Sequence, residues 1–326
     1  MGHRKLSAPR HGSLGFRPRK RARSIRPHIR SWPKSGSPKL FGFPTYKVGM
    51  IHAIVKDTYQ YSQTFGKEVF RALTVLEAPP IILAGLRFYS IDENKALRSI
   101  GEIWAKNLPK ELGRIVSIPK KERSVDLEKL KADARFVRAV IITQPWKAGL
   151  PKKKPDIMEI PLGGEIGEQL KYVDLLGSEI NVKDVFSPTT MVDAVAVSKG
   201  KGYEGPVARF GIKIIQRKKA KKTKRGPGSD SPMTPGAVMS TVPRAGQHGF
   251  HNRVDLNKMV LSIEDDPSKI SYNAGFKHYG LPRSPVVLLQ GSVPGASKRL
   301  VILRSAVRSY SKPLKEAPEI LYVSTK

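Results

Sequence analysis

Between Met1 and Lys56 the chain contains fourteen lysines and arginines and no aspartate or glutamate. Proline, glycine and serine recur through the opening stretch, which shows almost no apolar periodicity. Such a segment cannot bury enough apolar surface to offset the entropy lost on ordering. It also repels itself unless a polyanion is present, and nucleic-acid phosphates release condensed counterions as basic residues approach. We therefore predict a basic N-terminal extension over residues 1–40 that is disordered without RNA and orders on nucleic acid.

The positive charge of the whole chain is unevenly distributed. The 326 residues carry 59 Lys+Arg against 27 Asp+Glu, a net charge of +32 that indicates a nucleic-acid or anionic-surface partner. Segment 91–190 holds 15 of the acids against 18 Lys+Arg, a net of +3, which leaves +29 for the rest of the chain. This central segment is therefore predicted to face water, and the flanking parts to face phosphate.

Composition excludes several classes of protein. The absence of cysteine excludes disulfides, the usual zinc fingers and thiol catalysis. No apolar run approaches the ~18 residues of a membrane span, and the start lacks the apolar core of a secretory signal. Hydrophobic residues make up 39% of the chain, enough for a sizeable core. We expect an intracellular, soluble protein.

Hydrophobic periodicity divides the chain into strands and helices. Residues 91–108, 124–140 and 165–177 have a helical period. β-Branched runs bounded by Gly and Pro predict strands at 40–55, 69–77, 80–89, 191–198, 207–215, 259–263 and 299–304. This order predicts a mostly β protein, in which a β-barrel over 41–90 and 191–326 is interrupted by a helical α+β insertion over 91–190. For Phe41, Phe43 and Tyr46 a place in the barrel core is favoured over base stacking.

A second basic segment lies between two predicted strands. Seven of the nine residues 217–225 are Lys or Arg, and a Gly/Pro-rich stretch follows. We predict an extended basic loop over 216–256, because so long an irregular segment in a compact domain is functional or bound to a partner. A solvated tail or a targeting signal is the alternative, and the position between strands argues against both.

Two short motifs suggest chemistry, and neither supports catalysis. Gly200, Gly202 and Gly205 match G-x-G-x-x-G, but Pro206 and a β-branched run follow where a dinucleotide site needs a helix. These glycines are better explained by close approach to phosphate, with Lys199 and Lys201 beside them. His248 and His251 lack the neighbouring carboxylates of a metal site, so contact with bases or phosphate is favoured. Neither a nucleophile elbow nor a P-loop is present.

Several blocks of the sequence resemble one known family. They are RKLSAPRHGSLGFRPRKR (4–21), YKVGM (46–50), LEAPP (76–80), VDAVAVSKGKGYEG (192–205), RAGQHGFHNR (244–253) and GSVPGASKRLVILR (291–304). In order along nearly the whole chain, they resemble archaeal and eukaryotic members of the universal L3 family of ribosomal proteins. The moderate length and short C-terminus are similar to those of the archaeal type.

The resemblance implies a translation-protein-like six-stranded β-barrel, from which a long N-terminal extension and a long central loop penetrate rRNA toward the peptidyl transferase centre. It implies a cytoplasmic structural constituent of the large ribosomal subunit, with roles in early assembly and aminoacyl-tRNA accommodation. The expected partners are large-subunit rRNA and neighbouring ribosomal proteins, without a membrane, a small-molecule substrate or a second copy. No cofactor is expected, and Mg²⁺ only through bound rRNA. The alternatives are a free nucleic-acid-binding architectural protein and an RNA-modifying enzyme.

The candidate rRNA-binding residues fall in three groups. By resemblance, residues 231–239 form the apex of the loop, where Met233 replaces the usual tryptophan of a Trp-x-Pro pattern. The candidates in the N-terminal extension are Arg4, Lys5, Arg10, His11, Arg17, Arg19, Lys20, Arg21, Arg23, Arg26 and Arg30. Those in the barrel are Lys199, Lys201, Gly202, Lys298 and Arg299. Those in the central loop are Arg217, Lys218, Lys219, Lys221, Lys222, Lys224, Arg225, Met233, Pro235, Arg244, Gly246, Gln247, His248, His251 and Arg253.

Overall fold

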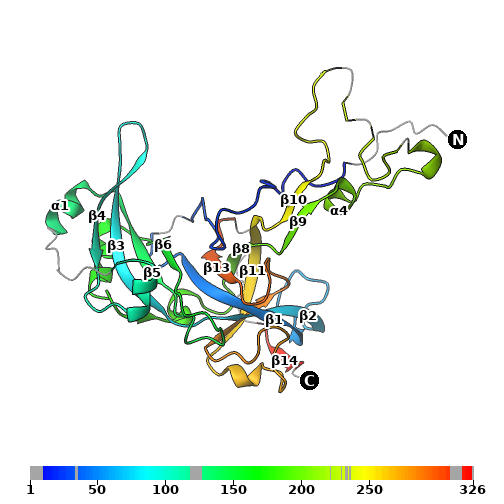
Figure 1. Ribbon diagram of the computed structural model, residues 1–326. Coiled ribbons are helices and arrows are strands. Elements are labelled where there is room, and N and C mark those ends of the chain that lie inside the picture. The colour runs from blue at the N-terminus through cyan, green and yellow to red at the C-terminus, as the bar shows by residue number, and fades with distance from the viewer. Residues whose placement is uncertain are drawn as a thin grey trace. The chain divides into compact units, whose positions relative to one another are not determined.

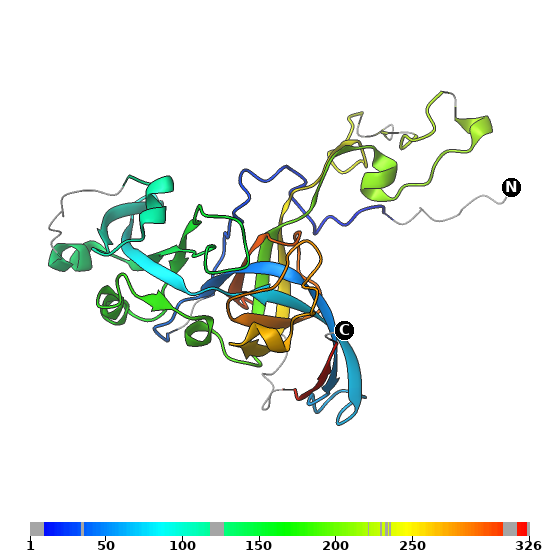
Figure 2. The same cartoon turned by 60° about the horizontal axis from the view of Figure 1, so that its bottom comes forward.

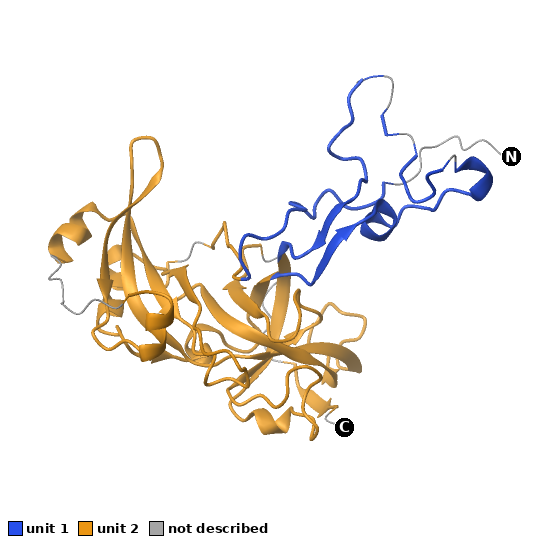
Figure 3. Ribbon diagram, viewed as in Figure 1, with its two compact units in different colours: residues 1–25, 197–253 blue, residues 26–196, 254–326 orange. Residues whose placement is uncertain are grey.

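The structure of the protein is a computed structural model, and it is mostly β with a few short helices, as predicted (Figure 1). It describes residues 10–33, 36–117, 127–220, 222–228, 230–231, 234, 236–308 and 318–324. Among these residues no helix has both the length and the apolar character needed to cross a membrane. The chain divides into two compact units: unit 1 comprises residues 1–25 and 197–253, and unit 2 comprises residues 26–196 and 254–326 (Figure 3).

Unit 2 is built around a ring of six antiparallel strands (Figures 1 and 2). The ring strands are β1 (Gly42–Lys56), β2 (Glu68–Glu77), β12 (Val286–Gln290), β11 (Asn252–Glu264), β8 (Met191–Val197) and β13 (Leu300–Ser305). Each pairs with the next in this order, and β13 also pairs with β1, so the sheet closes on itself. A short strand, β14 (Ile320–Val323), adds to β1.

The strands of the ring lie close to the predicted runs at 40–55, 69–77, 191–198, 259–263 and 299–304. Their β-branched and aromatic side chains pack inside unit 2, where Phe43 is 0% and Tyr46 is 1% exposed. Phe41 is buried as well, so burial of all three aromatics is confirmed. Phe43 lies in the main core cluster, whereas Tyr46 packs with Ala148 and Leu300 in a separate cluster. The strands β12 and β14 were not predicted from the sequence.

A second sheet carries most of the insertion. Its strands, in order, are β4 (Leu97–Trp104), β3 (Ile81–Ile91), β5 (Phe136–Ile142) and β6 (Ile157–Pro161), with β7 (Glu179–Ile180) paired to β3. One face buries Leu86, Phe88 and Ile160 in the same core cluster as Phe43 and Leu303 of the ring. The short helical segments of unit 2 are η1 (Lys110–Arg114), α1 (Leu127–Asp133), α2 (Ile166–Gln169), η2 (Leu170–Val173), α3 (Val182–Val185) and η4 (Pro267–Lys269).

Two of the helices predicted in the insertion are wrong in whole or in part. The segment 91–108 contains strand β4, because a turn at 92–96 folds it back onto β3. Of the segment 124–140, only α1 is helical, and its second half becomes β5. There Val137, Ala139 and Ile141 alternate into the core between β3 and β6, so sheet pairing overrides the helical period.

Two further predictions concern segments on either side of β8, a helix at 165–177 and a strand at 207–215. The helical prediction for 165–177 is confirmed in shortened form by α2 and η2, and Gly177 takes the left-handed φ of +85° expected at a helical stop. The strand predicted at 207–215 is wrong. Pro206 starts a short helix there, α4 (Pro206–Phe210), which ends at Gly211 with φ of +68°.

Candidate nucleic-acid interface

Unit 1 concentrates the positive charge of the protein. It contains 21 Lys+Arg and only two acids, Glu204 and Asp230, a net charge of +19. The much longer unit 2 carries the remaining +13. Both acids of unit 1 already have basic partners, since Glu204 contacts His248 and Asp230 contacts Arg244. No carboxylate side chain is therefore left over in unit 1 to neutralise its lysines.

A two-stranded ribbon organises unit 1. Strand β9 (Gly200–Glu204) pairs antiparallel with β10 (Gly246–Gly249), and the register shifts at Gly249. Gly249 has a φ of +70°, and a Cβ there would lie 1.9 Å from the carbonyl oxygen of Lys199, so only glycine fits. Phe250 follows with a φ of +52°, held by a bond from its N–H to the same carbonyl. The ribbon therefore depends on one glycine of the 244–253 motif.

Residues 16–22 have hydrogen-bond partners at the C-terminal end of unit 1. Arg253 donates to the carbonyl oxygens of Pro18 at 3.0 Å and Phe16 at 3.4 Å. The N–H of Ala22 donates to the Phe250 carbonyl at 2.7 Å. These contacts are internal to the chain, whereas the charge of the segment alone predicts self-repulsion. The disorder of residues 1–40 without RNA stays a prediction. Contacts of this kind would order residues 16–22 in the free protein, so a test of the prediction must include this segment.

The arginines of unit 1 are held mainly by carbonyl oxygens and aromatic rings. Arg10 donates to Thr241 O at 2.9 Å, and Arg17 donates to Ser240 O at 3.3 Å. The Arg19 guanidinium lies 4.8 Å from the centre of the Phe210 ring. A carbonyl or a ring orders a guanidinium without cancelling its charge. The ordered arginines thus keep their full attraction for phosphate.

Most of the described candidates of unit 1 are exposed. Exposed candidates are Arg10, His11, Arg17, Lys20, Arg21, Arg23, Lys199, Lys201, Gly202, Arg217, Lys218, Lys219, Lys222, Lys224, Arg225 and Arg244. The run at 217–225 contains one 3₁₀ turn, η3 (Arg217–Lys219). Partly buried ones are Arg19, Gly246, Gln247, His248 and Arg253, and His251 is buried.

The remaining candidates lie elsewhere. Arg26, Arg30, Lys298 and Arg299 belong to unit 2, where burial lowers the pKa of Arg299. Arg4, Lys5, Lys221, Met233 and Pro235 lie outside the described residues, as does the Met233 substitution at the loop apex.

Sequence reasoning missed three residues of unit 1. Arg209 donates from Nε to Gln247 O at 3.1 Å and from one terminal nitrogen to Arg244 O at 2.9 Å, so it joins α4 to β10. Phe210 lies against both Arg19 and Arg209. No local pattern marks these two, because their partners are distant in sequence. Tyr203 is 79% exposed on β9, and its place between lysine and glycine in the 200–205 motif did carry a signal for base stacking.

The docking of residues 16–22 should depend on the charge of His251. The residue is 5% exposed, and Nδ1 lies 2.8 Å from Lys20 O, so its N–H donates a hydrogen bond to that carbonyl oxygen. Burial lowers the pKa of His251 below its usual value, and nearby Arg253 and Arg209 act in the same direction. The unfolded state then binds more protons than the folded state below about pH 6.5, so this stability is present above that pH and is lost as pH falls.

We expect faster proteolysis within residues 16–22 at about pH 5.5 than at about pH 7.5. At the lower pH, protonation of His251 favours the state in which the ring is not buried, and residues 16–22 are then released more often. His251→Gln retains a donor for Lys20 O but does not titrate, and it serves as the control that cancels the pH dependence of the protease. Equal pH dependence in the two proteins would contradict a role for His251.

The fold and the charge of unit 1 together define a β-rich protein with a separate cationic body suited to a polyanion. The chain belongs to the ribosomal protein L3 family, whose match extends over residues 1–326. It is 45% identical to the large ribosomal subunit protein uL3 of Pyrobaculum arsenaticum, over 98% of both chains. It is 46% identical to the uL3 protein of Methanocaldococcus jannaschii, over 98% of this chain and 97% of the relative.

Family membership confirms the resemblance drawn from the sequence blocks, including its archaeal character. L3 proteins are structural ribosomal proteins and not enzymes. The RNA-modifying enzyme is therefore excluded.

Proposed function

We propose that this protein is a structural constituent of the large ribosomal subunit, in the cytoplasm, and that it binds large-subunit rRNA directly through unit 1. The observation that carries the proposal is the net charge of unit 1, +19, with both of its acids already paired. Phosphate neutralisation by such a surface supplies a large, sequence-independent part of the binding free energy. Exposed Tyr203 on β9 adds a ring on which a base can stack.

Within that role, we infer that the six-stranded ring is the translation-protein-like barrel of the family. The N-terminal extension and the central loop would enter the rRNA, with the loop directed toward the peptidyl transferase centre and the site of aminoacyl-tRNA accommodation. The ordering of guanidinium groups by carbonyl oxygens supports this placement, since a body that enters RNA needs structure that does not rest on carboxylates. A further role in early subunit assembly follows from the same contacts.

The partners that we propose are large-subunit rRNA and neighbouring ribosomal proteins, with a single copy of this chain in each subunit. Among the described residues no group of three or more His, Cys, Asp or Glu side chains could hold a metal ion. Any Mg²⁺ near the protein would then be held by rRNA phosphates, which suits a hard cation with oxygen ligands.

Sedimentation tests the proposal. We expect the native protein to co-migrate with large subunits through a gradient at about 0.5 M salt, because buried rRNA contacts survive screening that removes surface adsorption. Treatment with ribonuclease should release it. Recovery of the protein at the top of the gradient, in the free fraction, would refute membership of the subunit and favour a free architectural protein.

A further inference from the structure

The polar face of the second sheet forms the floor of a cleft in unit 2. The cleft has a volume of about 570 Å³ and is lined by residues of β3, β4, β5 and β6, by Ile302 of β13, and by residues 27–29 and 32. Trp32 and Trp104 contribute aromatic surface, and Val116 lies at its side. Residues 26–32 are tethered near both ends, since Arg26 donates to Ile157 O at 2.8 Å and Arg304 donates to Ser31. The cleft is therefore formed by segments that hydrogen bonds hold in place.

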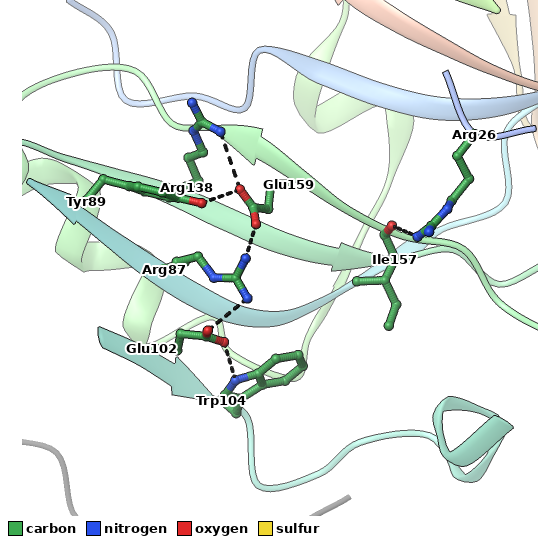
Figure 4. Close-up of polar contacts among 8 residues, drawn as sticks. All are labelled: Arg26, Arg87, Tyr89, Glu102, Trp104, Arg138, Ile157 and Glu159. Atoms are coloured by element: carbon green, nitrogen blue, oxygen red, sulfur yellow. Dashed lines mark hydrogen bonds and ion pairs between the residues drawn. The ribbon is translucent and has the colours of Figure 1, made fainter. Parts of the chain in front are cut away.

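Four charged side chains cross the floor in alternating sign (Figure 4). Arg87 pairs with Glu102 at 2.8 Å and with Glu159, and Arg138 contacts Glu159 at 3.4 Å. Tyr89 donates to Glu159 at 2.7 Å. The Nε1–H of Trp104 donates to Glu102 at 3.0 Å, which fixes the indole ring at the edge of the network. These contacts join the side chains of the floor into one network, in which the charges of the two arginines and the two glutamates cancel.

Two donors in this floor lack an acceptor. The Nε atoms of Arg87 and Arg138 are both buried, and neither has a hydrogen-bond partner among the described residues. A buried donor without an acceptor costs roughly 1–3 kcal/mol, and more when the group is charged. Because both atoms are buried within the floor, a molecule in the cleft does not reach them, and this cost belongs to the internal network of the floor.

The charge of the floor indicates which macromolecule, RNA or protein, the cleft can bind. Glu102 and Glu159 repel phosphate and cancel the attraction of Arg87 and Arg138, in contrast to unit 1. Neutral acceptors such as backbone carbonyls suffer no such repulsion. Tryptophan and arginine, surrounded by aliphatic side chains, are also the residues that dominate protein–protein binding sites. The cleft is complementary to a polypeptide.

We propose that this cleft is a docking site for an extended segment of a neighbouring large-subunit protein. The segment places an apolar side chain against Trp32 and Trp104, and its uncharged backbone lies over the floor, whose four charges cancel. This inference rests on the proposed function, because the partner is a protein of the same subunit. It concerns a surface of unit 2 whose floor, the second sheet, holds none of the candidate rRNA-binding residues.

Photocrosslinking in purified large subunits tests the docking. The full chain carries p-benzoyl-phenylalanine in place of Val116, which is 39% exposed and lines the cleft. Its matched control carries the same group in place of Leu97, which is 53% exposed on β4 and is not a lining residue. After irradiation and ribonuclease treatment, we expect the probe at 116 to form a defined adduct with one other large-subunit protein, and the probe at 97 to form no such adduct.

A second variant shows whether the adduct depends on the cleft. Trp104→Ala in the chain with the probe at 116 should lower the adduct yield by about tenfold, because truncation of an aromatic anchor weakens binding to at least that extent. Tyr61→Ala, which removes a 73% exposed aromatic elsewhere, should leave the yield unchanged. An undiminished yield in Trp104→Ala, in a chain that still assembles, would overturn the proposal.

Other outcomes also decide the matter. An adduct sensitive to ribonuclease would mean that RNA occupies the cleft, and an adduct within the chain itself would mean that the protein covers it. Either result, or no adduct at all, overturns the docking while leaving the proposed function intact. Absence of the chain from large subunits would instead refute the proposed function, and the docking with it.

Discussion

Replacement of Lys218, Lys219, Lys222 and Lys224 by glutamine should flatten the salt dependence of rRNA binding by about three units in a plot of log K against log salt. All four side chains are exposed, and unit 1 has no free carboxylate side chain to pair with them. Each lysine that neutralises one phosphate contributes roughly 0.7 to 0.9 to the slope by counterion release. The same arithmetic gives an affinity loss of up to about a thousandfold at 0.1 M salt.

Filter binding or fluorescence anisotropy over a range of salt concentrations measures the slope. The matched control replaces Lys95, Lys110, Lys131 and Lys171, four exposed lysines of the insertion, and removes the same net charge. We expect the slope of the control to stay close to that of the unchanged protein, because these lysines lie outside unit 1. Equal flattening by the two sets would mean that binding responds to net charge alone and that the run at 217–225 is not an interface.

The second large effect concerns the stability of the ring where β8 pairs with β13, which we call the seam. Asp193 on β8 and Arg304 on β13 are cross-strand partners whose side chains are 0% and 4% exposed, with 2.5 Å between Oδ2 and a guanidinium nitrogen. The carboxylate also accepts hydrogen bonds from the N–H groups of Asn257 at 3.0 Å and Val307 at 3.3 Å. Asp193→Ala removes the anionic partner of a buried guanidinium, which then keeps only its bond to Ser31, and it removes the acceptor of two amides.

We expect Asp193→Ala to lower the free energy of unfolding by about 3–5 kcal/mol, the cost of removing one partner of a buried ion pair. Urea denaturation, followed by the fluorescence of the tryptophans of unit 2, measures it. Asp265→Ala is the matched control, since Asp265 pairs with Lys183 while their side chains are 67% and 50% exposed. That exposed pair should contribute at most about 1 kcal/mol. A cost for Asp193→Ala no larger than for Asp265→Ala would show that the buried pair does not hold the seam.

Elements that depend on their own local sequence were predictable, and elements that depend on distant partners were not. Strands such as β1 and β13 were predictable because their β-branched and aromatic residues are buried on both faces or alternate strictly. Segment 124–140 failed because its apolar spacing satisfies a helical period, while β3 and β6 offer it strand partners that no local pattern reveals. The strand predicted at 207–215 failed for another reason: Pro206 and Gly211 delimit a short helix there.

The candidate site shows the same division. The composition of residues 1–25 and 217–225 was sufficient to predict a cationic interface, since charge is a property of the residues wherever they fold. The role of Arg209 was not predictable, because Gln247 and Arg244, whose carbonyl oxygens it binds, lie more than thirty positions away. Burial of His251 and its bond to Lys20 depend on a contact between opposite ends of the sequence of unit 1.

By itself, the sequence determined the mostly β class, the family and the sign and location of the charge, because these follow from composition, local periodicity and matching blocks. Only the tertiary structure decided which strands close the ring, which arginines are ordered by carbonyl oxygens, and how Glu102, Arg87, Glu159 and Arg138 come to line one cleft. Each of these depends on pairing between segments far apart in the chain. The free energy of such pairing comes from burial and hydrogen bonds that exist only once the chain has folded.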